Sequence, residues 1–302
     1  MNEFKMESKQ YKVFYVFNII LLTAIGIVFL FPYLNIMAKA FNESADTALG
    51  GITIYPRKFT LENIRVVLID PSIIRAFVIS VLRVLIGTVI AVMIQFLAAY
   101  GLVKKGLRGK KGIIMFLMIP MFISGGIVPN YILYSKIGML NNFMVYILPT
   151  AFSFYNMVVI RTYLTTIPES LKEAGRIDGA GELRIMWEIV VPLSLPIIAT
   201  IALWTSVGYW NDWTTTLYYI TNKKWYSLQY LLYSVIQESE RIQSLMRDAI
   251  ESGRDVTKIR VQTSPESLRA AQVVVTTLPI LVAYPFLQKY FIKGIMIGSV
   301  KE

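Results

Sequence analysis

Residues 167–196 read IPESLKEAGRIDGAGELRIMWEIVVPLSLP, a polar stretch between two strongly apolar parts of the chain. Pro168 suits the first turn of a helix, and Glu169 is favoured near the positive end of the helix dipole. Small and apolar residues then recur at helical spacing, at Ile167, Leu171, Ala174 and Gly175. This spacing predicts a short helix with one narrow apolar face.

The same stretch continues with a turn and a second helical segment. Asp178-Gly179 is a turn dipeptide, and an amphipathic run follows from Leu183 to Val190. Pro192 then leads into the next apolar run. The sequence therefore predicts a compact helix-turn-helix on a membrane surface, with small residues that allow close approach to the backbone of another protein.

Apolar runs on both sides of this stretch indicate a membrane protein. Of the 302 residues, 55% are hydrophobic, and the mean hydropathy is +0.56. A bilayer core of about 30 Å needs about 20 apolar residues in a helix. We predict an all-α integral membrane protein with six transmembrane helices, at about 13–34, 74–102, 112–134, 143–164, 195–219 and 271–292. The first run is too long for a signal-peptide core, so we expect a retained span after a cytoplasmic segment, residues 1–12.

Basic residues set the predicted orientation of these spans. Residues 103–111, VKKGLRGKK, hold five Lys or Arg, whereas the next connection, 134–142, holds only Lys136. Because basic residues collect in short cytoplasmic loops, 103–111 is predicted to be cytoplasmic. Counting spans from that loop places both termini and residues 165–194 in the cytoplasm and residues 220–270 outside.

The composition excludes several kinds of chemistry. The chain has no cysteine and no histidine, so it offers no disulfide, no thiolate or histidine metal site and no Ser-His-Asp triad. We predict no catalytic residue and no metal site. The net charge of +11 falls largely in loops between apolar runs, so we also predict no nucleic-acid partner.

The chain also lacks a phosphate-binding loop. Gly101 to Gly106 has the glycine spacing of a Walker A motif, but it continues with Leu107-Arg108 instead of Lys-Ser/Thr. Phosphate binding in such a loop needs that lysine and hydroxyl. We therefore expect the chain not to hydrolyse ATP.

The third apolar run contains a cluster of helix breakers. Pro120, Gly125, Gly126 and Pro129 fall within IPMFISGGIVPNYIL, residues 119–133. Irregular backbone at membrane depth survives only against protein or water. We predict a break near the outer end of this run, which is either a packing kink or part of a cavity wall.

The fifth run contains aromatic and polar residues side by side, at Trp204, Tyr209, Trp210, Asn211, Asp212 and Trp213. Aromatic faces beside hydrogen-bonding groups suit sugar rings. This cluster is a candidate substrate path, to which we add Tyr155 and Asn156, a polar break in the fourth run. The alternative is an interfacial aromatic belt, since 209–219 lies near the outer end of the run.

Two of these runs also carry a charge deep within the predicted span. Arg83 and Asp212 lie roughly 13 Å and 10 Å inside the outer ends of their predicted spans. A lone charge at that depth normally faces protein or water and often has a partner. The matched depths predict a contact between Arg83 and Asp212; the alternatives are that Arg83 extends outward to water, or that Asp212 lines the sugar path alone.

The stretch quoted first resembles a known motif, the EAA loop of binding-protein-dependent ABC importer permeases. That motif reads Glu-Ala-Ala, three residues, Gly, nine residues, Ile-x-Leu-Pro. The matching residues here are Glu173, Ala174, Gly179, Ile189 and Pro192. The chain departs from the motif at Gly175, where the family has Ala, and at Val191, where it has Leu; both changes are small.

The resemblance extends along nearly the whole chain, to carbohydrate permeases of the maltose-transporter kind and most to the lipoprotein-type polysaccharide branch. FISGGIVPNYILYSKIGMLNN, VGYWNDW and the ending KGIMIGSVKE all resemble that branch. It implies the type I importer fold, with a cytoplasmic coupling helix that docks on a separate ATPase subunit. The residues implied in coupling are Glu173, Ala174, Gly175, Asp178, Gly179 and Ala180, with Gly298, Val300 and Lys301 as a further C-terminal ATPase contact.

The resemblance also implies a set of partners in a bacterial cytoplasmic (inner) membrane. These are a second, different permease subunit, a dimer of ATPase subunits that bind Mg-ATP, and an extracellular or periplasmic sugar-binding protein. No cofactor is expected in this chain itself. The external loop 220–270 has helical periodicity in part, and it is expected to contact the sugar-binding protein; a helix resting on the membrane is the alternative.

Three rival functions remain. A secondary transporter predicts internal repeats and ionisable coupling residues within the spans, and the sequence shows no clear repeat. A membrane enzyme is disfavoured by the absence of histidine. An ABC permease for a solute other than a sugar remains open, because the residues do not identify the substrate.

Overall fold

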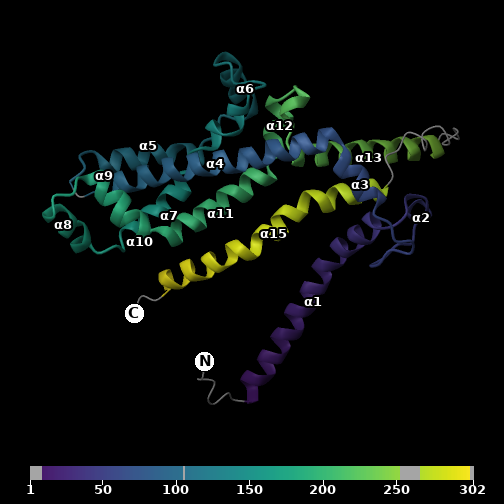
Figure 1. Ribbon diagram of the computed structural model, residues 1–302, viewed down its shortest axis with the longest axis horizontal. Helices are drawn as coiled ribbons and strands as arrows, with labels where there is room; N and C mark the ends of the chain where they lie inside the picture. The colour runs from purple at the N-terminus through teal and green to yellow at the C-terminus, as the bar shows by residue number, and fades with distance from the viewer. Residues whose placement is uncertain (1–8, 105, 252–265, 300–302) are drawn as a thin grey trace. The chain divides into compact units, whose positions relative to one another are not determined.

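The computed structural model of the chain describes residues 9–104, 106–251 and 266–299, and beyond residue 282 it describes the backbone alone. Apart from an isolated bridge between Asn42 and Phe59, the elements in these ranges are helices (Figure 1). Those that precede the predicted cytoplasmic hairpin are α1 (Lys9–Ala40), α2 (Ser44–Ala48), α3 (Glu62–Ile69), α4 (Pro71–Val103), α5 (Lys110–Phe122), α6 (Ile127–Lys136), η1 (Phe143–Tyr146), η2 (Leu148–Thr150) and α7 (Phe154–Leu164).

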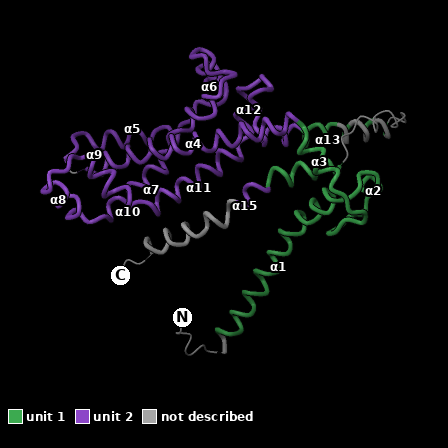
Figure 2. The backbone as a smooth tube through the Cα atoms, in the orientation of Figure 1, with its two compact units in different colours: residues 1–70, 235–277 green, residues 71–234, 278–302 purple. Residues whose placement is uncertain are grey.

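The hairpin and the elements after it complete the described chain. They are α8 (Glu169–Ile177), α9 (Glu182–Ile185), the π-helical turn η3 (Met186–Val190), α10 (Val191–Leu193), α11 (Leu195–Asn211), α12 (Thr214–Tyr219), η4 (Lys223–Trp225), α13 (Leu228–Glu251) and α15 (Glu266–Ser299). The helices form two compact units, residues 1–70 with 235–277 and residues 71–234 with 278–302 (Figure 2).

The first unit contains α1 and a small polar fold that follows it. Most side chains of α1 are exposed from Tyr11 to Phe31; a helix that is apolar all round suits lipid or another helix. After α1, the Asn42 side chain donates to Asp46 Oδ2 (2.9 Å) and accepts from the Lys58 backbone (2.7 Å). Arg57 pairs with the same carboxylate at 3.0 Å. These bonds give the loop after α1 a fixed shape.

The second unit is organised around α4. Its buried face follows helical spacing and includes the small residues Gly87, Ala91 and Ala99. Between membrane helices, small residues let backbones approach closely, and dispersion contacts replace the hydrophobic driving force. α4 packs on α11 and α7 along this face. The main core, in the half toward the hairpin, is formed by Phe96, Ala99, Leu102, Met157, Ile160, Leu164, Ile167, Ile185, Met186, Val190 and Ile201.

Within the described ranges, two helices are long and apolar enough to cross a bilayer, Tyr11–Ala40 and Pro71–Val103. Three further candidate crossings are bent pairs of helices: α5 with α6 at 112°, the η1–η2 segment with α7 at 52°, and the α9–α10 segment with α11 at 78°. The predicted break of the third run is thus confirmed at Gly125–Gly126. The sixth predicted span, 271–292, falls within α15, partly beyond the described side chains.

Two predicted spans are not continuous helices. The run 143–164 begins with two 3₁₀ turns, and Ser153 then accepts from the Asn156 backbone (3.3 Å) to start α7. The run 195–219 is interrupted between Asn211 and Thr214. Asp212 causes this second break, because its carboxylate bonds to the residues that follow and so competes with helical bonding.

Candidate functional site

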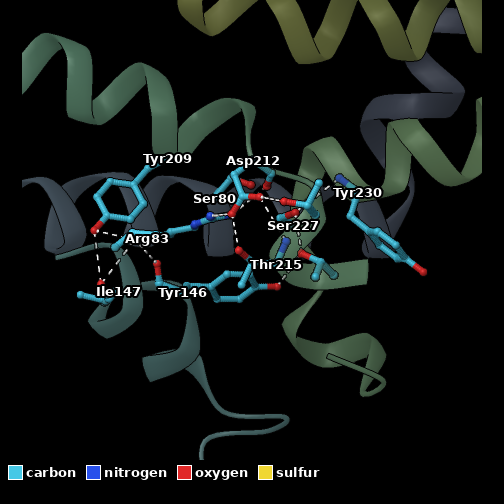
Figure 3. A network of polar contacts seen from close by, with 12 residues as sticks. Ser80, Arg83, Tyr146, Ile147, Tyr209, Asp212, Thr215, Ser227 and Tyr230 are labelled. Atoms are coloured by element: carbon cyan, nitrogen blue, oxygen red, sulfur yellow. Dashed lines mark hydrogen bonds and ion pairs between the residues drawn. The ribbon is translucent and has the colours of Figure 1, made fainter. Parts of the chain in front are cut away.

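A buried ion pair joins α4 to the break after α11. The Arg83 side chain is 1% exposed, and its Nη2 pairs with the Asp212 carboxylate (Figure 3). Arg83 Nη1 also donates to the Asp212 carbonyl oxygen at 2.9 Å. The contact predicted from matched depths is therefore confirmed. Arg83 binds both the side chain and the backbone of the residue at which the helix breaks.

The Asp212 carboxylate has further donors from the start of α12. Thr214 Oγ1 donates at 2.7 Å, Thr215 Oγ1 at 2.6 Å and the Thr215 backbone at 3.1 Å. Such bonds satisfy backbone N–H groups at a helix start. Together with Arg83 they occupy both carboxylate oxygens, so this charge is fully compensated within the chain.

Two tyrosine rings surround the Arg83 guanidinium. Its central carbon lies 4.5 Å from the Tyr146 ring centroid and 5.7 Å from that of Tyr209, within the range of cation–π attraction. Gly87 allows the Tyr209 ring to lie against α4, because a Cβ at this position would stand 2.8 Å from the ring. Arg83 and Gly87, one turn apart on α4, thus position Tyr209.

The network continues from Tyr146 to the external segment. The Tyr146 hydroxyl bonds to Thr216 Oγ1 (2.8 Å) and donates to the Trp225 carbonyl oxygen (2.6 Å), and Thr216 bonds to Ser227 (2.9 Å). The Leu228 backbone, at the start of α13, donates to Ser80 of α4 (2.9 Å). Figure 3 shows Ser80, Tyr146 and Ser227 of this network close to Asp212.

A polar pocket of about 350 Å³ lies beside the ion pair. It is near the lower end of the roughly 300–1,000 Å³ typical of small-ligand sites. Gln95, which is 1% exposed, lines it, and so does Thr205; Gln95 Oε1 and Thr205 Oγ1 have no hydrogen-bond partner within the described chain. Buried polar groups normally have partners, so these two atoms are unsatisfied groups within the wall of the pocket.

A second cluster forms the hairpin between α7 and α11. Gly179 has φ +79°, its N–H donates to the Arg176 carbonyl (3.1 Å), and the Ala180 N–H donates to the Gly175 carbonyl (2.9 Å). This is the Schellman pattern, in which a left-handed residue ends a helix. The turn predicted from Asp178-Gly179 is therefore confirmed.

Glu182 fixes the hairpin to the end of α4. Its carboxylate pairs with Lys104 and Arg176, each at 3.1 Å, and accepts from the Tyr100 hydroxyl at 3.2 Å. The bond from Lys104 and then that from Arg176 hold the pKa of Glu182 below its usual range, against the raising effect of partial burial. Glu182 gives no signal in the sequence, because Tyr100 and Lys104 are distant from it along the chain.

Gly175 lets α8 pack closely on the second arm of the hairpin. A Cβ at Gly175 would stand 2.9 Å from Ile189 and 3.3 Å from Ile185. Gly175 and Ile167 are buried, whereas Leu171 and Ala174 are exposed. The predicted small-residue face is therefore split: one part packs inside the chain and the other part points outward.

Comparison with known proteins agrees with this arrangement. Residues 110–297 match the family described as binding-protein-dependent transport system inner membrane component. The chain belongs to this family. Its members are transport components and not ATPases, so the chain is a membrane permease component without an expected enzymatic activity.

Two curated proteins of Bacillus subtilis (strain 168) resemble this permease over most of their length. Protein LplC is 34% identical over 294 residues, which cover 97% of each chain. The polygalacturonan/rhamnogalacturonan transport system permease protein YtcP is 32% identical, over 91% of this chain and 94% of that protein. A chain in the crystal structure of a bacterial ABC transporter that imports the acidic polysaccharide alginate has the same fold, with a TM-score of 0.82, 24% identity and coverage of 95% and 99%.

The permease structure distributes the predicted path residues over different surroundings. Asn156, Tyr209 and Asp212 line the polar pocket. Tyr155 and Trp204 are exposed and stack on each other with ring centroids 6.2 Å apart. The other three have separate contacts: Trp210 is buried edge-on against Phe77, Asn211 accepts from Gln229, and Trp213 stacks on Tyr233 at 3.9 Å.

Several pocket residues were missed by sequence reasoning. Gln95, Thr150, Ser153 and Thr205 line the pocket together with the predicted residues. A glutamine within a long apolar run is a usable signal, because polar residues in spans usually face protein or water. The hydroxyl residues give no such signal, since their groups can bond to the backbone of their own helix.

The predicted coupling residues lie at the tip of the hairpin. Glu173, Ala174, Asp178 and Gly179 are exposed, Ala180 is half-buried and Gly175 is buried. Ile177 and Leu183 beside them are among the most exposed apolar side chains of the permease, at 85% and 72%. Gly298 is described only as part of the α15 backbone, and Val300 and Lys301 lie outside the described residues.

Proposed function

We propose that this chain is a permease subunit of an ATP-driven importer for oligosaccharides or polysaccharide fragments, in the bacterial cytoplasmic (inner) membrane with both termini in the cytoplasm. The observation that carries the proposal is the polar pocket beside Arg83 and Asp212, in a chain whose relatives include sugar permeases along nearly their whole length. Neutral amide and hydroxyl groups with a tyrosine ring suit the polar edge and the apolar face of a sugar.

The hairpin is proposed to couple the chain to an ATPase subunit. Its tip has an exposed helix end, a left-handed glycine turn and the exposed side chains of Ile177 and Leu183. Exposed apolar groups of this size on a cytoplasmic loop suit a protein contact. The partner supplies Mg-ATP and its hydrolysis, and this chain transmits the movement to the spans that surround the pocket.

The proposal includes three kinds of partner. A second, different permease subunit completes the translocation path, a pair of ATPase subunits drives it, and an extracellular sugar-binding protein delivers the substrate. The predicted external segment is ordered up to Glu251, because η4 and α13 follow α12 without a long irregular loop. This order supports the proposed contact with the sugar-binding protein.

The coupling proposal is tested with Glu173→Lys in the complete importer. The reversed charge is expected to abolish substrate-stimulated ATPase activity and uptake, because it lies on the exposed tip and leaves the core untouched. Glu62→Lys, the same charge change on an exposed residue of the predicted outer side, is the control and should keep both activities. Wild-type coupling in the Glu173 variant would refute the docking role.

The pocket proposal is tested with Gln95→Leu. It keeps the side-chain volume but removes the whole amide, including the bond that Nε2 donates to the Ala151 carbonyl (3.3 Å). Sugar binding should weaken about two- to twelvefold, the value of one hydrogen bond, and co-purification of the other subunits checks that the complex still assembles. Gln237→Leu, an exposed change on α13 outside the pocket, should leave uptake unchanged. The measurement is concentration-dependent uptake into proteoliposomes, with the sugar identified from the purified complex. Equal apparent affinities for wild type and the Gln95 variant would remove the pocket from the path.

A further inference from the structure

Helix length and the predicted orientation together place the bend between α5 and α6 at membrane depth. α5 begins at Lys110, at the predicted cytoplasmic side, and its 13 residues rise about 20 Å. The hydrocarbon core is about 30 Å thick. The chain then turns by 112° into α6. The non-helical residues of the bend therefore lie inside the bilayer core, short of its outer surface.

The backbone at this bend is open. Gly126 has φ +83°, and no atom lies within 4 Å of the position that a Cβ would take. At Gly125 only Pro129 and Asn130 of the same turn come within that range. The Gly126 N–H donates to Ser124 Oγ (3.3 Å), but the N-terminus of α6 has no side-chain cap, so the N–H groups of Ile127 and Val128 remain available.

The side chains around the bend are large and apolar. Phe122, Ile123, Ile127 and Val128 are each more than half exposed, and we name these four residues the bend surface. Neither α5 nor α6 contains a buried residue. Within the described chain, nothing of the permease itself covers this surface.

The open backbone groups and the exposed apolar side chains together indicate what covers the bend surface. Lipid cannot satisfy open backbone groups at this depth. Water can satisfy them, but a water-filled passage does not favour four large apolar side chains. Another protein chain within the membrane meets both requirements, because it offers apolar packing and hydrogen-bonding groups.

The segment that carries the bend surface is held in a fixed position. In Figure 1, α6 projects away from the long axes of α4 and α5, beside α12. Asn141, with φ 56°, accepts at Oδ1 from the Thr221 backbone (2.7 Å), the Thr221 hydroxyl (3.0 Å) and the Asn222 backbone (2.9 Å). Tyr134 of α6 packs edge-on against Tyr219 at 4.9 Å. A surface fixed before association loses little entropy on binding.

We propose that the bend surface is the contact with the second permease subunit, which covers Gly125 and Gly126 and packs on Phe122, Ile123, Ile127 and Val128. This assignment rests on the proposed function, which supplies the second permease. Of the proposed partners, that subunit is the one embedded in the bilayer at the depth of the bend; the ATPase and the sugar-binding protein lie on either side of it.

The experiment places a photo-reactive benzoylphenylalanine at Val128 in the complete importer. Val128 is exposed, so the replacement keeps the core, and uptake activity confirms assembly. The same probe at Leu85, exposed on the continuous helix α4, calibrates the yield of lipid adducts. After irradiation, the adducts of this chain are identified by mass spectrometry, and the subunits that co-purify are identified without irradiation.

The expected product is an adduct between this chain and a different permease chain, several-fold more abundant at Val128 than at Leu85. Lipid adducts alone at Val128, or adducts of this chain with itself, would overturn the assignment of the bend surface. Co-purification separates the two proposals. If a second permease co-purifies but forms no adduct, the surface is wrong and the heterodimer stands; if no second permease co-purifies, the proposed partnership itself fails.

Discussion

Two clusters of charge lie along α4, one within its first half and one at its C-terminal end, and they differ in burial. Arg83 in the first half is 1% exposed and pairs with Asp212, whereas Glu182 and Lys104 at the hairpin end are each more than 40% exposed. A buried pair is strongly destabilised when one partner is removed, by about 3–5 kcal/mol. An exposed pair contributes at most about 1 kcal/mol. The Arg83 cluster therefore holds the fold together, and the hairpin cluster adjusts the orientation of a surface element.

The largest effect is expected from breaking the buried pair. Arg83→Gln or Asp212→Asn alone should lower the stability of the folded chain by about 3–5 kcal/mol, because each leaves a charge without its partner. The double variant should recover a large part of this loss. The measurement is thermal unfolding of the purified complex for the wild type, both single variants and the double variant. Strictly additive losses would mean that the contact contributes no coupling energy.

An intermediate effect is expected at the turn of the hairpin. Gly179→Ala forces a side chain into the left-handed region and should destabilise the hairpin by about 1 kcal/mol or somewhat more. Gly101→Ala is the control, since Gly101 lies within α4 beside the hairpin, has no positive φ and has open space around its Cβ position. Protease sensitivity of the hairpin in inside-out vesicles distinguishes the two. Equal sensitivity of both variants would contradict the requirement for glycine at residue 179.

The smallest effect is expected at Glu182. Its lowered pKa means that the carboxylate stabilises the hairpin above the pKa it has in the unfolded chain, and that this contribution disappears as the pH falls through the lower folded value. At pH 7, Glu182→Gln should reduce stability by less than about 1 kcal/mol. The difference from wild type should vanish well below pH 4 and should shrink in 1 M salt.

Glu188→Gln serves as the control for the Glu182 experiment. Glu188 pairs with Arg184 within one turn of the same segment and makes no bond to α4. At pH 7 its variant should change stability less than the Glu182 variant. A larger loss for Glu188→Gln would mean that the attachment of the hairpin to α4 does not depend on Glu182.

Features that depend on interactions between residues close together in the sequence could be predicted, whereas most features that depend on distant residues could not. The turn at Gly179 and the break at Gly125–Gly126 were predicted correctly, because the chemistry that produces them is local. The ion pair of Arg83 with Asp212 was predicted from depth, since a bilayer restricts where a buried charge finds a partner. In these cases the local residue pattern or the depth in the bilayer was sufficient for the prediction.

Other features depended on contacts that no local pattern reveals. The break after Asn211 lies in a run that is apolar enough for a span, and it arises from Asp212 bonding to the following threonines. Glu182 became important only through Lys104 and Tyr100 of another element. The roles of Gln95 and Thr205 required the pocket, which forms where α4, α7 and α11 meet. The substrate and the partners remain proposals.

The distance of 129 residues between Arg83 and Asp212 also has a consequence for synthesis of the chain. At about 5–20 residues per second, α4 is made roughly 6–26 seconds before its counter-charge exists. During that interval the membrane must hold a lone arginine, at a penalty of about 2.5–3.5 kcal/mol on insertion scales. The rest of α4 is apolar enough to offset this penalty. The apolar side chains of α4 thus stabilise the newly inserted helix before α7 and α11, which pack on it, have been synthesised.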